Sequence, residues 1–337
     1  MVRREGGEIL SLVFFYFIFM YKVLITHSLP YKGIELLYEN FHVIIPEYGM
    51  IDGVLLDEHL KDCDALLCTY AFKVTKRVID KAHNLKIIAN FGIGCDNIDV
   101  DYAKSKGICV TNSPGMAAEY TAELTLALML NVMRKVKEND LKIRGCSGRN
   151  VIDVMSNLGN TLYGKTLGLI GMGNIAQAVA RRAKVFGLKI IYYSRHRVDL
   201  SVESNLSLEW RESMSDLLRD ADIISLHIPA VSKNKLMSEQ EFKLMKPNSV
   251  LINTARGVLV DEGALIKALK EHWIYGAALD VFENEDEINP QLLMLDNVLL
   301  SPHNGTGTIE ARVQSAMKAS LNIYNYFYLD KKDLNAV

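Results

Sequence analysis

Four polar side chains in the second half of the sequence follow short apolar runs that are typical of buried strands. They are Arg256, Asp280, Glu285 and His303. In an open sheet of parallel strands, ligands bind in the crevice at the carboxyl ends of the strands, so these side chains are expected to meet there. An isolated arginine or histidine at such a point is more often structural. The spacing of 24, 5 and 18 residues between the four favours a shared site.

These residue types suit the reduction of a 2-keto acid. An arginine fork pairs with a carboxylate or polarises a carbonyl group. A histidine can donate the proton that accompanies hydride transfer, because its charge changes near physiological pH. A neighbouring carboxylate stabilises the imidazolium form and orients the ring. The candidate catalytic residues are therefore Arg256, Glu285 and His303.

The most specific local pattern is the sequence Gly-Met-Gly-Asn-Ile-Ala at residues 171–176. In such a pattern the first glycine makes a tight turn, and the second lets the backbone approach a pyrophosphate at the N-terminus of the next helix. Alone, the pattern is often a plain turn. Here an apolar run at 165–170, a helix expected over 177–186 and a strand expected over 188–193 supply the β-α-β context. The expected cofactor contacts are Gly171, Gly173, Asn174, Ile175 and Ala176.

The end of the second of these strands bears on the choice of cofactor. An acidic residue there would bind the ribose 2′-hydroxyl of NAD, but no carboxylate follows the strand before Asp199. The residues present instead offer hydroxyl, imidazole and guanidinium groups, and a guanidinium suits a 2′-phosphate. They are Ser194, Arg195, His196 and Arg197. NADP is therefore favoured over NAD, and the open alternative is that the arginines are solvated surface residues.

From Lys22 onward, short apolar and β-branched runs alternate with helical patterns, which is typical of an α/β fold with parallel sheets. In a first series, strands are expected at 23–26, 43–45, 65–68, 86–89 and 108–110, with helices at 33–40 and 73–83. A second series runs from Leu167 to Leu300. The expected fold is α/β, with two doubly wound, Rossmann-like domains of parallel sheet and the active site in the cleft between them.

The turn-forming sequence at residues 112–115 marks the expected boundary between the two series. Single helices are expected over 118–137 and over 308–329. The chain then divides into an apolar extension at 1–20, a substrate domain made of 21–113 plus 304–337, and a dinucleotide-binding domain at 114–303.

The composition excludes several classes of protein. Of the 337 residues, 49% are hydrophobic and 23% are charged, which excludes a disordered chain. A net charge of −2 with scattered basic residues argues against a nucleic-acid partner. The cysteines form no CxxC pair and suit buried thiols in a reducing cytoplasm rather than disulfides or a metal site. They are Cys63, Cys68, Cys95, Cys109 and Cys146.

The first twenty residues do not fit this picture. Arg3 and Arg4 precede an almost wholly apolar run from Ile9 to Met20, a pattern typical of a signal sequence or a membrane anchor. No small-residue cleavage site follows, and the run continues without a linker into the first expected strand. A non-essential extension is therefore favoured and a membrane is not expected as a partner, with an anchor as the open alternative.

Several segments of the sequence resemble the D-isomer-specific 2-hydroxyacid dehydrogenase family. They are Asn-Thr-Ala-Arg-Gly at 253–257, Gly-Ala-Ala-Leu-Asp-Val-Phe-Glu at 276–283, Ser-Pro-His-Asn-Gly at 301–305, Phe-Gly-Ile-Gly-Cys-Asp-Asn-Ile-Asp at 91–99, and Thr-Asn-Ser-Pro-Gly at 111–115 with Ala-Glu at 122–123. The resemblance extends from Tyr21 to about Leu329 and looks closest to the glyoxylate/hydroxypyruvate reductase branch.

The resemblance implies a role for each matching residue. Arg256 would bind the substrate, His303 would be the acid/base with Glu285 as its partner, and Asp280 would hold the nicotinamide carboxamide. Further cofactor contacts are implied at Thr254, Ala255, Arg256, His303 and Gly305. The substrate carboxylate would be held by the backbone amides of Gly92, Ile93 and Gly94.

The implied activity is hydride transfer from NAD(P)H to a small 2-keto acid, with glyoxylate or hydroxypyruvate favoured, giving the D-2-hydroxy acid. A homodimer is the expected assembly. Two departures concern the site: Asp286 stands where a proline commonly follows the glutamate, and Asn304 replaces an aliphatic residue. His227, also at a strand end, is expected to be structural or to line the nicotinamide side.

Three other functions remain as alternatives: two are enzymatic and one is that of a dinucleotide-binding protein. A phosphoglycerate dehydrogenase often carries an added C-terminal domain, whereas 34 residues follow His303 here. A formate dehydrogenase would pair its histidine with glutamine rather than Glu285. A corepressor that senses the dinucleotide keeps the same arginine, glutamate and histidine, but it usually has long disordered tails.

Overall fold

The computed structural model describes residues 20–115, 117–145, 154–229, 235–329 and 334–337. The apolar run expected at 9–20 lies outside these ranges except for Met20, and so does Cys146. The chain divides into two compact units, one of residues 1–116 with 308–337 and one of residues 117–307. The turn that carries His303 and Asn304 is thus part of the second unit. Within the described ranges, no helix combines the length and the apolar character that a membrane crossing requires.

The first unit is built on a five-stranded sheet with the order β2-β1-β3-β4-β5. All of its strand pairs are parallel. Each strand lies within one residue of its expected position: β1 at Lys22–Ile25, β2 at His42–Ile44, β3 at Ala65–Cys68, β4 at Ile87–Asn90 and β5 at Cys109–Thr111.

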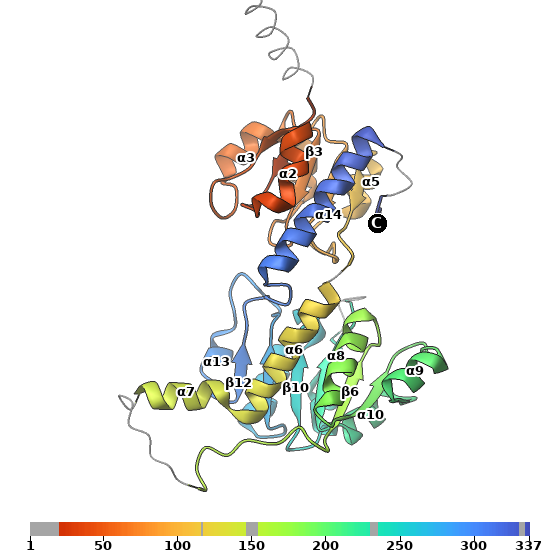
Figure 1. The fold of residues 1–337 in the computed structure, drawn as a ribbon. Coiled ribbons are helices and arrows are strands. Elements are labelled where there is room, and N and C mark those ends of the chain that lie inside the picture. The colour runs from red at the N-terminus through yellow and green to blue at the C-terminus, as the bar shows by residue number, and fades with distance from the viewer. Residues whose placement is uncertain (1–19, 116, 146–153, 230–234, 330–333) are drawn as a thin grey trace, which may run out of the picture. The chain divides into compact units, whose positions relative to one another are not determined.

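Helices cover both faces of this sheet (Figure 1). Successive side chains of a strand point to opposite faces, so Val23 and Ile25 pack with α2 (Tyr31–Asn40) and the C-terminal α14 (Ile309–Tyr328). Leu24 packs on the other face. That face is covered by α3 (Gly53–Leu60), α4 (Lys76–Lys81) and α5 (Val100–Ser105).

The second unit is built on a seven-stranded sheet with the order β12-β11-β10-β9-β6-β7-β8. Its strand pairs are parallel throughout. The strands are β6 at Thr166–Ile170, β7 at Lys189–Tyr193, β8 at Leu208–Trp210, β9 at Ile223–Leu226, β10 at Val250–Asn253, β11 at Gly276–Leu279 and β12 at Val298–Leu300. The chain order reverses at β6, between β7 and β9, and a dinucleotide binds at such a switch point.

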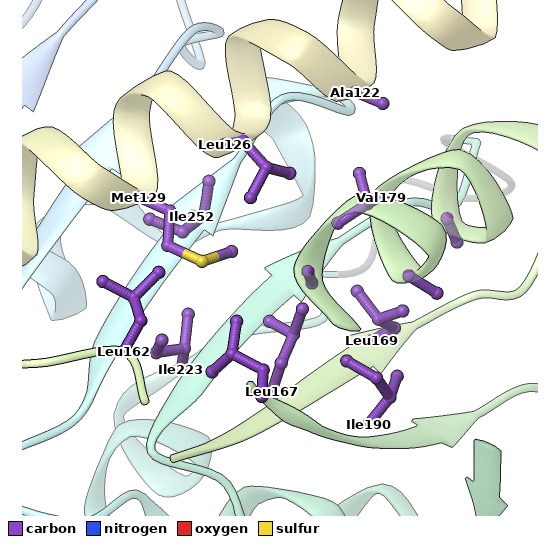
Figure 2. Packing of buried hydrophobic residues seen from close by; sticks show 14 of the residues in the cluster. Ala122, Leu126, Met129, Leu162, Leu167, Leu169, Val179, Ile190, Ile223 and Ile252 are labelled. Carbon is purple, nitrogen blue, oxygen red and sulfur yellow. The ribbon is translucent and has the colours of Figure 1, made fainter. Parts of the chain in front are cut away.

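One face of this sheet is covered by α6 (Ala117–Arg134) and α8 (Asn174–Val185). Figure 2 shows Leu126 and Met129 of α6 and Val179 of α8 over strand residues that include Leu167 and Ile252. The opposite face is covered by α10 (Met214–Asp220), α11 (Glu239–Leu244) and α12 (Glu262–Lys270). The sheet is therefore buried on both sides, as the near-continuous apolar strands require.

The single helix expected over 118–137 is wrong in its extent. The helix α6 ends at Arg134, and Lys135 adopts a positive φ of 53°, which a continuous α-helix does not allow. The side chain of Asn131 then accepts a hydrogen bond from the backbone N–H of Lys137 at 3.2 Å. A separate helix, α7 (Val136–Gly145), follows the break.

Candidate active site

The proposed acid/base and its carboxylate partner are in contact. Nδ1 of His303 lies 2.7 Å from Oε2 of Glu285. The side chain of His303 is 30% exposed and that of Glu285 is 42% exposed, so solvent and small molecules reach the pair. A carboxylate at this position stabilises a protonated ring and fixes its orientation.

The turn that carries His303 is held by Asp280. The backbone N–H of His303 donates to the carbonyl of Asp280 at 2.8 Å, and the N–H of Asn304 donates to Oδ1 of Asp280 at 2.7 Å. His303 itself has a φ of +49°, a conformation that is uncommon outside glycine and tends to occur at functional sites. Asp280 is 1% exposed, and its carboxylate thus stabilises the turn in addition to any cofactor contact.

Arg256 follows β10 on a turn shaped by Asn253. The side chain of Asn253 donates to the carbonyl of Arg256 at 2.9 Å and accepts from the N–H of Ala255 at 3.1 Å. The hydroxyl groups of Thr254 and Thr125 are 3.0 Å apart and buried. A Cβ at Gly257 would lie 1.8 Å from the carbonyl oxygen of Phe282. Only glycine lets the turn after β10 pack against the segment that leads from Asp280 to Glu285.

The glycine-rich turn after β6 has the geometry that a pyrophosphate requires. Gly171 has a φ of +93°, and a Cβ there would lie 2.5 Å from the carbonyl oxygen of His227. Gly173 is the N-cap residue of α8 with no side-chain cap, and a Cβ there would meet no atom within 4 Å. Ala176 is fully buried, which is the close packing expected of the third position. The space beside Gly173 is open and no described side chain caps the start of α8, so the turn fits a dinucleotide.

The two arginines after β7 lie in different surroundings. Arg197 binds Glu203 through two hydrogen bonds of 2.8 Å each. Arg195 and His196 are exposed, and the hydroxyl of Ser194 donates to the carbonyl of His196 at 2.5 Å. The partnership with Glu203 was not expected from the sequence, because Glu203 lies on a separate helix beyond Asp199.

In the first unit, the residues predicted to hold the substrate carboxylate form a loop after β4. The carbonyl groups of Gly92, Ile93 and Gly94 all accept hydrogen bonds from within the unit. Their donors are the N–H of Ser113 at 3.0 Å, Asn112 at 2.9 Å and the buried Asn90 at 2.6 Å. The three amide groups of the loop donate to no described residue of the chain, so they can bind an anion.

The role of Asn90 was missed in the sequence. Its amide nitrogen donates to the carbonyl of Gly94. A second asparagine, Asn97, donates to the carbonyl of Thr69 at 3.0 Å and to the carbonyl of Phe72 at 3.1 Å. The signal was present, because an asparagine that ends an apolar strand must find partners when it is buried.

His227 has a structural environment. Its Nε2 lies 2.9 Å from the hydroxyl of Ser225, and burial lowers the pKa of His227 to about 4. A ring with this pKa is neutral at physiological pH and is a poor source of a proton there. This agrees with the expectation that His227 is not the catalytic acid.

Comparisons with known proteins agree with this fold. A family model described as the D-isomer specific 2-hydroxyacid dehydrogenase, NAD binding domain, matches residues 126–305. A glyoxylate reductase of Thermococcus litoralis is 44% identical over 308 residues, which cover 90% of this chain and 92% of the relative.

Two solved structures are also similar. A protein of Thermus thermophilus superposes with a TM-score of 0.85 at 34% identity, covering 94% of this chain and 99% of that one. An NADPH-dependent glyoxylate/hydroxypyruvate reductase of Sinorhizobium meliloti, in complex with NADP and malonate, superposes with a TM-score of 0.79 at 29% identity, covering 92% and 94%.

The chain belongs to the D-isomer specific 2-hydroxyacid dehydrogenase family. Within that family it stands in the glyoxylate reductase branch. The expected fold class and enzyme class are thereby confirmed: the protein is an NAD(P)-dependent oxidoreductase that reduces a 2-keto acid. It binds a nicotinamide dinucleotide through the second unit.

Proposed function

We propose that this enzyme reduces glyoxylate or hydroxypyruvate to the 2-hydroxy acid and uses NADPH in preference to NADH. The observation that supports the acid/base step is the 2.7 Å contact between His303 and Glu285 on a turn anchored by Asp280. The names of the T. litoralis and S. meliloti relatives support the choice of substrate. Neither name is that of a phosphoglycerate dehydrogenase or a corepressor.

In this proposal each residue has one task. The amide groups of Gly92, Ile93 and Gly94 bind the substrate carboxylate, and Arg256 binds the carboxylate and keto oxygen through its planar fork. His303 donates a proton to the keto oxygen, and Glu285 stabilises the ring while it is charged. A bound nicotinamide supplies the hydride that C2 of the substrate accepts. His303 then recovers its proton from solvent. That the substrate lies between the two units stays a prediction.

The cofactor would be held by residues that the sequence already indicated. Gly171, Gly173 and the N-terminus of α8, with Asn174, Ile175 and Ala176, would bind the pyrophosphate. Thr254, Ala255, Asp280 and Gly305 would lie along the nicotinamide half. The preference for NADP rests on the absence of a carboxylate between Tyr193 and Asp199, and on the exposed Arg195.

A panel of keto acids tests the proposal. Glyoxylate, hydroxypyruvate, pyruvate and 2-ketogluconate are assayed separately with NADPH and with NADH, and kcat/KM is compared. The expected result is the highest kcat/KM for glyoxylate or hydroxypyruvate with NADPH. A higher kcat/KM for pyruvate or 2-ketogluconate would contradict the substrate, and a higher kcat/KM with NADH would contradict the cofactor.

We also propose that the protein is a homodimer that uses α7. No residue of α7 is buried, although Val136, Leu141 and Ile143 are apolar and 54%, 55% and 46% exposed. Apolar side chains gathered on one short helix are typical of an interface. Sedimentation should give a dimer, and Leu141→Asp with Ile143→Asp should give a monomer. Val185→Asp, on the exposed side of α8, is the control and should remain a dimer. A monomer in the unaltered protein contradicts the proposal.

A cytoplasmic location stays a prediction. It is consistent with the buried thiols of Cys63 and Cys68, since burial raises the pKa of Cys63 to about 12 and makes that thiol unreactive.

A further inference from the structure

The loop after β7 contains two arginines, and the sequence predicted the same cofactor contact for both. In the structure they have different surroundings. The guanidinium of Arg197 binds both oxygens of Glu203 and lies 5.4 Å from the ring centroid of Trp210 in β8. The side chain of Arg195 makes no hydrogen bond or ion pair with any residue of the described ranges. Arg195 is therefore available to a ligand, and Arg197 is engaged within the protein.

Glu203 is the centre of this arrangement. It lies on α9 (Leu200–Leu206) and is 7% exposed. It also accepts a hydrogen bond of 2.6 Å from the hydroxyl of Tyr192, a fully buried residue of β7. The hydroxyl oxygen of Tyr192 in turn accepts from the N–H of Val198 at 3.2 Å. The loop is thus tied to β7 through Val198 and to α9 through Arg197.

Separating Arg197 from Glu203 is unfavourable in free energy. The bidentate guanidinium of Arg197, with the hydroxyl of Tyr192, lowers the pKa of Glu203 to about 2, so the carboxylate is charged at every working pH. The side chain of Glu203 is 9% exposed and that of Arg197 is 49% exposed, so if Arg197 left to bind a ligand, Glu203 would lose its cation in a position with little access to solvent, which is unfavourable. We therefore expect Arg197 to remain with Glu203 when a dinucleotide binds.

We propose that Arg197 and Glu203 form a fixed clamp that positions residues 194–198 so that Arg195 alone of the two arginines binds the 2′-phosphate of NADP. Arg197 and Glu203 are positioning residues for cofactor selectivity, and neither touches the cofactor. This inference rests on the proposed preference for NADP. It differs from the sequence-based expectation, in which Arg197 was itself a cofactor contact.

The direction in which one substitution changes the affinity for NADPH distinguishes a positioning role of Arg197 from direct contact between Arg197 and the phosphate. Glu203→Gln removes a negative charge beside the loop and releases Arg197. If Arg197 bound the phosphate directly, this change would strengthen or preserve the binding of NADPH. If the clamp positions Arg195, the same change loosens the loop and weakens NADPH binding by about tenfold, the value of one charge-assisted hydrogen bond.

The experiment measures dissociation constants by calorimetry for NADPH, NADH, 2′,5′-ADP and 5′-AMP, with no turnover involved. Arg195→Ala and Glu203→Gln should each weaken NADPH and 2′,5′-ADP, and spare NADH and 5′-AMP. Glu209→Gln is the matched control: it removes one exposed carboxylate from the neighbouring strand β8 and should change none of the four constants. Thermal unfolding of each variant shows whether it is folded.

A double variant tests whether Glu203 acts through Arg195. If Glu203 acts only by placing Arg195, then Glu203→Gln should cause no further loss in a protein that already carries Arg195→Ala. Losses that simply add would overturn the clamp. If Glu203→Gln does not fold, Arg197→Lys serves instead, because it keeps a cation next to Glu203 but lacks the two-point fork. An unchanged ratio of NADPH to NADH affinity in Arg197→Lys would overturn the clamp.

The outcomes also separate the clamp from the cofactor preference. An unaltered protein that binds 2′,5′-ADP no better than 5′-AMP has no selectivity for the 2′-phosphate, and both proposals are then wrong. Selectivity that is present, is lost in Arg195→Ala and survives Glu203→Gln would leave the NADP preference standing and overturn only the clamp.

Discussion

Glu285 and His303 are 18 residues apart in the sequence, and their side chains meet at 2.7 Å. Each belongs to a segment with its own backbone support. The segment of Glu285 is held through Glu283, whose N–H donates to Glu262 of α12 at 2.7 Å. The turn of His303 is held by Asp280 at 2.8 Å. The two segments therefore keep their positions when either side chain of the pair is replaced, and substitutions there report on chemistry.

His303→Asn is expected to reduce turnover by about 10²–10⁴-fold, the usual contribution of a positioned general acid. Asparagine is chosen because it tolerates the left-handed backbone that alanine would strain. The dissociation constant for NADPH should stay nearly unchanged. His42→Ala, an exposed histidine of β2, is the control. Near-native turnover in His303→Asn would show that another group supplies the proton.

Glu285→Gln is expected to reduce kcat for keto-acid reduction by about tenfold, the value of one charge-assisted hydrogen bond. The carboxylate of Glu285 lies 2.7 Å from Nδ1 of His303, where its negative charge stabilises a charged ring and its oxygen orients the ring. Glutamine keeps an oxygen acceptor but lacks the charge, so the loss of kcat measures the contribution of the charge. The dissociation constant for NADPH should stay nearly unchanged. An unchanged kcat would mean that Glu285 is not the partner of His303 in the reaction.

Arg256→Lys is expected to reduce kcat/KM by about 10- to 100-fold although the charge is retained, because an ammonium group lacks the planar fork that makes two hydrogen bonds at once. Arg219→Lys, on the exposed surface of α10, is the matched control and should have no effect. Recovery of most activity in Arg256→Lys would reduce the role of Arg256 to a general electrostatic one.

Gly171→Ala is expected to lower the free energy of unfolding of the second unit by about 1–3 kcal/mol and to weaken dinucleotide binding. The added Cβ would lie 2.5 Å from the carbonyl oxygen of His227, at a φ of +93°. Gly164→Ala is the control, since its φ is +75° and its Cβ would meet no atom within 4 Å. It imposes the backbone strain without the clash. Equal losses in urea denaturation for the two variants would exclude close packing as the cause.

His227 is expected to make stability depend on pH. The unfolded chain takes up a proton at this residue as the pH falls below 6.5, whereas the folded chain does so only near pH 4. The free energy of unfolding should therefore decrease as the pH is lowered from 6.5 to 4. This residue contributes up to about 1.4 kcal/mol of that decrease per pH unit. His227→Gln has no titrating group, and its stability profile between these limits should be flatter. Identical slopes in the two proteins would contradict the effect of burial.

Although β8 was not expected, the alternation of apolar runs and helical patterns predicted each strand of the first sheet to within one residue, and β6 and β7 of the second sheet equally closely. This succeeded because buried parallel strands must be apolar over their whole length, as Ala65–Cys68 is. The end of α6 was predicted less well. Nothing in the residues around Lys135 forbids a helix, and the break depends on a left-handed backbone and a contact from Asn131 that are set by the folded structure.

The candidate site likewise contains residues that the sequence indicated and partners that it did not. Local patterns in the sequence indicated Gly171, Gly173, Arg256 and His303 as candidate site residues, because each follows a strand and the carboxyl ends of parallel strands lie at one edge of a sheet. The partners of Arg197 and of the loop at Gly92 were not predicted. Glu203 and Asn90 are defined by contacts between separate elements, and spacing in the sequence carries no record of those contacts.

The helix α14 has a consequence for how the chain folds as it is synthesised. It supplies Ala316, Ala319 and Ile323 to the core of the first unit, yet it comes from the end of the chain. The second unit is one continuous segment, so all of its strands have left the ribosome while the first unit still lacks a face of its core. Domains fold as units during synthesis. The second unit, although it begins at residue 117, is therefore completed first, and the sheet of the first unit gains the rest of its core only after α14 has been made.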